Sequence, residues 1–135
     1  MTARADKGAM RFHAGTDYIT EVGETVLSPV SGWVERIKTP GRPGITGLLI
    51  VNEQRYSASV YYIEPTPEIR AALVDKQRYR VEAGKTEIGV AQDIHPAYPA
   101  EVPQHIHVNL SDPNGNAVAP NGKVVSQKTP QVVQK

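Results

Sequence analysis

Apolar and polar residues alternate along several short stretches of the chain, which eleven glycines and eleven prolines separate from one another. Alternation over four to eight residues is typical of a strand that buries one face. The pattern therefore predicts an all-β protein, with strands at residues 14–19, 25–28, 32–38, 47–52, 58–63, 87–91 and 105–110.

Residues 66–76 (TPEIRAALVDK) depart from this alternation and have the signals of a helix. Thr66 is a residue type that caps helix N-termini, and Pro67 follows it where the first turn tolerates proline. Ile69 and Leu73 are spaced to share one helical face. We therefore expect one short helix in an otherwise β-rich chain.

The length of 135 residues suits one domain, which we expect to span residues 1–125. Residues 39–46 (TPGRPGIT) contain two prolines and two glycines and are predicted to form a loop. From Ser111 the chain is rich in Asn, Gly, Pro and Gln, so residues 126–135 are predicted to form a flexible C-terminal tail.

Composition limits the classes of partner. Fifteen basic and fourteen acidic residues give a formal charge of +1, and no basic run suggests nucleic acid or an anionic membrane. The absence of cysteine excludes disulfides and thiolate metal sites. No apolar run has the roughly 20 residues of a membrane span, and the first ten residues (MTARADKGAM) lack the apolar stretch expected of a signal peptide.

Three of the four histidines occur in two compact motifs. His13 and Asp17 are four residues apart in RFHAGTDY, and His105 and His107 are two apart in PQHIHVNL. Residues two apart on a strand share a face, so His105 and His107 would both project into one groove. An imidazole from this distant strand can join His13 and Asp17 as the third ligand of a catalytic zinc. Taken singly, the motifs have simpler readings: hydrogen-bonded histidines on a strand, or a turn formed by Gly15 and Asp17.

The run HAGTDYITEVGETVLSPVSGWVERI, the stretch VEAGKTEIGVAQ and the strand PQHIHVNL together resemble lysostaphin/LytM-type zinc metallopeptidases, from about Arg11 to Leu110. This resemblance implies two antiparallel sheets flanking an open groove, with activity on bacterial cell-wall peptides. It also implies that His13, Asp17 and His107 bind zinc, with His105 either as the catalytic residue that transfers protons or as a residue that supports a ligand.

Active members of that family carry a further mid-domain histidine within Tyr-x-His-Leu, where this chain has SVYYIEP. Depending on the alignment register, Tyr62 or Ile63 stands at its place. The segment resembles a branch that includes leukocyte cell-derived chemotaxin, which has a Tyr-Ile-x-Pro run. A Tyr62 hydroxyl near zinc can stabilise an oxyanion, or it can be one more aromatic on a strand. His95 can enter the groove from its loop, or remain on the surface.

Three further residues are candidates for substrate binding. Tyr61 and Tyr98 would form the groove wall, with packing in the core or at the rim as the simpler reading. Arg11, just before the first motif, can bind a substrate carboxylate through two hydrogen bonds, or be a solvated charge.

The leading hypothesis is a zinc endopeptidase that cleaves stem peptides or cross-links of peptidoglycan. The alternative is an inactive zinc-stabilised module that binds a cell-wall peptide or glycan or a protein partner, and a third is a cytoplasmic structural domain. We expect the protein to act in the periplasm or outside the cell. Without a visible signal peptide, this would require delivery by a secretion machine or a phage particle, or a signal peptide that has been trimmed from the sequence. An injected toxin would also require a cognate inhibitor, or immunity, protein.

Overall fold

The computed structural model describes residues 15–39, 41, 44–120, 124–125 and 131–134. These residues form mostly β-structure, which confirms the predicted all-β class. The elements in chain order are β2 (Thr16–Ile19), β3 (Thr25–Leu27), β4 (Gly32–Lys38), β5 (Gly47–Val51), β6 (Ser57–Tyr61), β7 (Ile63–Pro65), α1 (Pro67–Val74), β8 (Tyr79–Val81), β9 (Glu87–Ala91), β10 (His105–Ser111), β11 (Ala117–Val118) and β12 (Gln131–Gln134).

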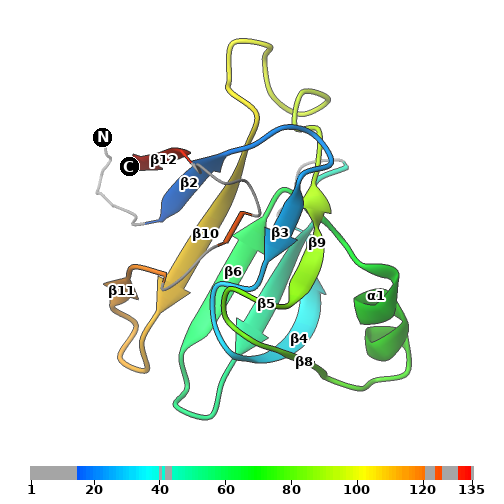
Figure 1. Cartoon of the computed structure of the whole chain (residues 1–135), viewed down its shortest axis with the longest axis vertical. Coiled ribbons are helices and arrows are strands. Elements are labelled where there is room, and N and C mark those ends of the chain that lie inside the picture. Colours follow the sequence, from blue (N-terminus) through cyan, green and yellow to red (C-terminus); the bar gives the residue numbers. More distant parts are fainter. Residues whose placement is uncertain (1–14, 40, 42–43, 121–123, 126–130, 135) are drawn as a thin grey trace.

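The strands form two antiparallel sheets. The large sheet has the order β12-β2-β10-β6-β5-β4-β8, with β11 paired to β10, and the small sheet has the order β3-β9-β7. In Figure 1, β3 and β9 lie in front of β5 and β6. One cluster of buried side chains joins the strands of both sheets, so the small sheet packs against one face of the large sheet.

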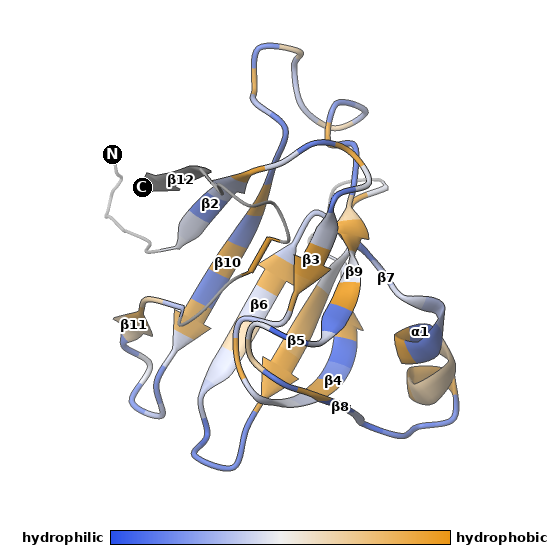
Figure 2. Cartoon of the chain, in the orientation of Figure 1, coloured by the Kyte–Doolittle hydropathy of each residue, from blue (hydrophilic) through white to orange (hydrophobic). Residues whose placement is uncertain are grey.

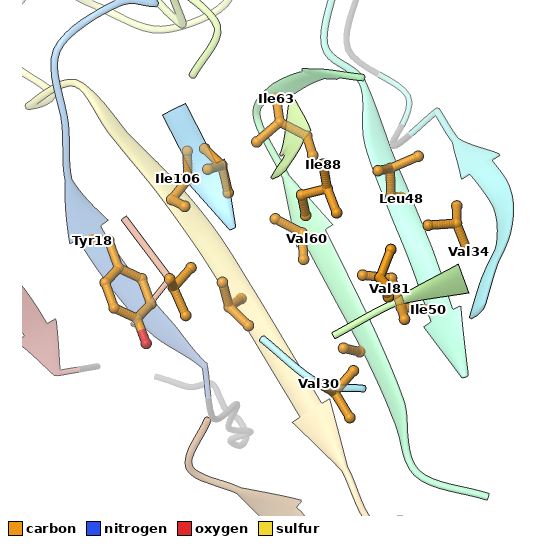
Figure 3. Close-up of a cluster of buried hydrophobic side chains, with 14 of the residues drawn as sticks. Tyr18, Val30, Val34, Leu48, Ile50, Val60, Ile63, Val81, Ile88 and Ile106 are labelled. Carbon is orange, nitrogen blue, oxygen red and sulfur yellow. The ribbon is translucent and has the colours of Figure 1, made fainter. Parts of the chain in front are cut away.

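The core lies between the sheets and follows from the alternation in the sequence. In β10 the apolar residues Ile106, Val108 and Leu110 are buried, whereas His105 and His107 between them are only partly buried. Alternating bands of colour along β10 show the same pattern (Figure 2). Figure 3 shows Ile106 beside the core residues of neighbouring strands. Burying each such side chain contributes roughly 1.5–3 kcal/mol.

Tyr62 separates β6 from β7, so the single strand predicted at residues 58–63 is in fact two. Its φ of 73° lies in the left-handed region, which costs a non-glycine residue about 1–2 kcal/mol. The N–H groups of Tyr62 and Ile63 both donate to the Thr46 carbonyl, at 2.9 and 3.2 Å. This bend moves the chain from the large sheet to the small one, and Ile63 becomes fully buried in the core.

The predicted helix is confirmed as α1, and Thr66 caps it by accepting a hydrogen bond from the Ile69 N–H at 3.1 Å.

Strands β8, β11 and β12 were not predicted. The last of them lies within residues 126–135, where we expected a flexible tail, and it pairs with β2. Among the described residues, no helix has the length and apolar character needed to span a membrane.

Candidate metal centre

Asp17, His105 and His107 lie together on the face of the large sheet opposite the core, which we call the histidine face. Strands β2 and β10 are antiparallel neighbours, and their register pairs Asp17 with His107. The His107 Nδ1 is 2.5 Å from Asp17 Oδ1, and the His105 Nε2 is 4.0 Å from Asp17 Oδ2. The fold therefore brings together two motifs that are 90 residues apart.

The orientation of His107 is fixed by Asn109, two residues further along β10. The His107 Nε2 is 3.0 Å from Asn109 Oδ1. An amide oxygen only accepts hydrogen bonds, so Nε2 carries the hydrogen and donates it. This contact directs the other ring nitrogen, Nδ1, at the Asp17 carboxylate. Histidines that bind metals are oriented by a second hydrogen bond of this kind.

The contact between His107 and Asp17 is compatible with a proton or with a metal ion. A carboxylate oxygen only accepts hydrogen bonds, so the 2.5 Å contact is a hydrogen bond when His107 Nδ1 carries the proton. Nitrogen and oxygen donors of these types also suit zinc, so Asp17 and His107 have the donor chemistry of two zinc ligands. Zinc ligands at about 2.0–2.2 Å in a tetrahedral site lie about 3.3 Å apart, so this contact would widen by just under 1 Å around a bound metal.

Gly15 leaves the space that the His107 ring occupies. A Cβ added to Gly15 would overlap Asn109 Oδ1 and His107 Nε2, and would lie 2.5 Å from His107 Cε1. No side chain fits there without displacing the His107–Asn109 pair. The glycine of the His-x-Gly-x-Asp motif therefore serves the packing of the site.

His105 is held in the orientation of a proton acceptor. Its Nδ1 is 2.7 Å from the Pro103 carbonyl oxygen and donates to it. In a neutral imidazole the opposite nitrogen, Nε2, then carries the lone pair, and this atom is the one near Asp17 Oδ2. The His105 side chain is 12 % exposed, so the ring is largely shielded while its Nε2 faces Asp17.

Two tyrosines lie beside the two histidines, and a third contacts one of these tyrosines. The Tyr62 ring meets His105 edge-on, with centroids 5.1 Å apart and an interplanar angle of 83°. The Tyr62 and Tyr98 hydroxyls are 2.8 Å apart, which joins the loop before β10 to the site. The Tyr61 ring centroid lies 6.3 Å from that of His107. Since Ile63 is buried in the core, Tyr62 is the member of the Tyr62–Ile63 pair that lies at the site.

His95, expected as a second catalytic candidate, is exposed, and both of its ring nitrogens have partners within its own loop. Nδ1 is 3.1 Å from Asp93 Oδ1, and Nε2 is 2.9 Å from the Val102 carbonyl oxygen. These contacts link two parts of the loop, so His95 stabilises the loop conformation.

The predicted ligand His13 and the predicted substrate-binding residue Arg11 lie outside the described residues. Within the described ranges, no group of three His, Asp or Glu side chains is arranged to hold a metal ion. Of the three predicted ligands, the structure describes Asp17 and His107 but not His13.

Sequence reasoning did not single out Asn109, although its signal was present. Asn109 follows His107 by two residues on the same strand, so period-two alternation puts it on the histidine face. A polar residue at that place is a natural partner for the second ring nitrogen of a metal-binding histidine.

Comparisons with protein-family models, with curated proteins and with solved structures found no match. The family resemblance seen in the motifs consequently remains a prediction.

Proposed function

We propose that the chain is a LytM-type zinc endopeptidase that hydrolyses peptide bonds in stem peptides or cross-links of peptidoglycan. The observation that carries the proposal is the approach of His107 Nδ1 to Asp17 Oδ1 at 2.5 Å, beside a correctly oriented His105. Asp17, His105 and His107 all belong to the motifs that resemble those of the family. Its characteristic ligand pattern assigns His13 as the third ligand.

Asp17 and His107 would hold the metal from adjacent strands, and Asn109 would keep the His107 ring in the tautomer that binds it. Zinc held by such ligands lowers the pKa of a coordinated water to about 7 and polarises a substrate carbonyl. Asp17 is 4 % exposed, so little water competes for its carboxylate.

His105 would move the protons of the reaction. With Nδ1–H fixed on the Pro103 carbonyl, Nε2 accepts the proton of the attacking water and returns it to the leaving amine. A positioned acid–base group of this kind contributes about 10²- to 10⁴-fold in rate. The perpendicular contact between the Tyr62 and His105 rings would keep the imidazole from rotating away.

Tyr62 would stabilise the negative charge that develops on the carbonyl oxygen. When the Tyr98 hydroxyl donates across their 2.8 Å contact, Tyr62 can direct its own hydrogen toward the substrate. Loss of one oxyanion donor costs about 2.7–4 kcal/mol, equivalent to about 10²- to 10³-fold in rate.

Hydrolysis of purified peptidoglycan tests the proposal. Zinc-loaded protein is expected to release new amine ends, and His105→Ala is expected to lower the rate at least about 100-fold. Gln77→Ala, which changes an exposed residue after α1, serves as the control and should retain the full rate. An absence of new amine ends from the zinc-loaded protein would overturn the enzyme hypothesis.

A second candidate function is a zinc-stabilised module that binds cell-wall peptides without cleaving them. Tyr62 favours it, because a phenol at neutral pH donates a hydrogen bond but does not take up a proton as an imidazole does. Such a module would sediment with peptidoglycan and release no amine ends. Turnover distinguishes the two, since Tyr62→Phe lowers the release of amine ends in the enzyme, whereas a module releases none with either residue.

A further inference from the structure

A continuous row of residues crosses the large sheet from the candidate metal centre to β4. The strand registers pair Asp17 with His107, His107 with Tyr61, Tyr61 with Gly47, and Gly47 with Lys38. Directly paired residues lie on the same face of a sheet. Lys38 is therefore on the histidine face, three strands away from His107.

Gly47 allows Tyr61 to lie across β5, toward β4. A Cβ added to Gly47 would lie 2.9 Å from Tyr61 Cδ1 and 3.4 Å from Cε1, so the ring occupies the place of the missing side chain. On the far side, Lys38 Nζ is 5.3 Å from the centre of the Tyr61 ring and donates to Ser59 Oγ at 3.1 Å. These two contacts hold the ammonium group on the Tyr61 side of β4.

The distance from Lys38 to the metal centre matches a short peptide. The Tyr61 ring centre is 6.3 Å from the His107 ring centre and 5.3 Å from Lys38 Nζ. Together these distances put Nζ within about 12 Å of the His107 ring. An extended chain advances about 3.3–3.6 Å per residue, so about three residues span this gap.

The charge at this end of the row is positive. Within the part of the chain that the structure describes, Lys38 contacts a hydroxyl and an aromatic ring but forms no ion pair with a carboxylate. Arg36 pairs with Leu49, which places it on the same face as Lys38, and it is exposed. Ammonium and guanidinium groups without acidic partners attract an anionic ligand.

We propose that Lys38, supported by Tyr61 and Ser59, binds a carboxylate of the substrate about three residues from the bond that is cleaved. This inference rests on the proposed function and specifies its substrate as an acidic peptide that lies across the strands. The Tyr61 ring and the Ser59 hydroxyl limit the freedom of the lysine, so less entropy is lost when the carboxylate binds. Lys38 is thus a specificity-determining residue outside the reacting centre.

Peptide binding to the full chain, treated with a chelator to prevent turnover, tests this proposal. The probes are N-acetyl-tetra-alanine with a free C-terminal carboxylate and the same peptide with a C-terminal amide, titrated by two-dimensional NMR. The unaltered protein is expected to bind the acid at least about fivefold more tightly than the amide, as one charge-assisted hydrogen bond allows. Lys38→Met should abolish the preference without weakening amide binding, and Lys38→Arg should keep it.

Lys85→Met is the control for loss of one exposed lysine and should keep the preference. The proposal is overturned if Lys38→Met retains the preference for the acid, or if the unaltered protein shows none or binds neither peptide. Assays of peptidoglycan hydrolysis on the same preparations separate the two proposals. If the protein prefers the acid but does not hydrolyse peptidoglycan, the proposed enzyme function is wrong and the Lys38 subsite stands. If it hydrolyses peptidoglycan but does not prefer the acid, the enzyme function stands and the subsite is wrong.

Discussion

Replacement of Asn109 by alanine should weaken zinc binding while leaving the fold intact. The substitution removes the acceptor that lies 3.0 Å from His107 Nε2. The imidazole then loses the hydrogen bond that orients its ring with Nδ1 directed at Asp17, and other ring rotations become accessible. Asn109 is partly exposed, so water can replace the lost contact and the fold should lose no more than about 1.5 kcal/mol.

The expected magnitude follows from the role of such partners. Loss of the hydrogen bond that orients a metal-binding histidine typically lowers metal affinity 10- to 100-fold. With about 1.4 kcal/mol for each factor of ten, the predicted loss is about 1.4–2.8 kcal/mol of zinc binding. This exceeds the roughly 0.5–1.5 kcal/mol of a single neutral hydrogen bond, because the ligand orientation is lost as well.

Competition with a chromophoric chelator measures the zinc dissociation constant of each variant. Ser111→Ala is the matched control, since Ser111 lies on the same face of β10 but pairs with Ser57 and Ala117, away from His107. The Asn109 variant should bind at least tenfold more weakly than the control. The reasoning is refuted if the two variants bind zinc equally well, or if Ser111→Ala weakens binding as much.

Other substitutions test further parts of the structure. Gly15→Ala should lower zinc affinity at least about tenfold in the same competition assay, because its Cβ would displace the His107–Asn109 pair; unchanged affinity would contradict this packing. Ile106→Ala removes a fully buried side chain and should cost about 2–5 kcal/mol in urea unfolding. Val22→Ala, at a residue 60 % exposed, should cost less than about 0.5 kcal/mol, and similar losses for both would contradict the assigned core. Burial raises the pKa of Tyr18 above its ordinary value of 10.0, so the unfolded chain ionises first as the pH rises. Stability should therefore fall as the pH passes 10 toward the folded-state pKa, and Tyr18→Phe should remove that part of the loss; an unchanged profile would contradict it.

The parts of the fold that depend on local pattern were predictable from the sequence. The alternation in β10 gives both its buried face and the shared face of His105 and His107. Thr66 and Pro67 predict the start of α1 by capping chemistry alone. Strand β8 was missed because it has only three residues, and its pairing with β4 depends on tertiary structure.

The site was predictable only as far as its two motifs contain the information. The motifs predict that Asp17 and His107 meet, but the left-handed Tyr62 that ends β6 cannot be read from a run of residues typical of strands. Lys38 reaches the site only through three strand pairings, which no local pattern contains. Its contact with Tyr61 also depends on the absence of a side chain at Gly47.

The most direct test of the account is an anomalous-difference map of zinc-loaded crystals, with data collected on both sides of the zinc absorption edge. The account predicts one strong peak at about 2.0–2.2 Å from both His107 Nδ1 and an Asp17 carboxylate oxygen. A zinc peak only at another place, or no zinc peak beside His107 and Asp17 in crystals soaked with excess zinc, would contradict it.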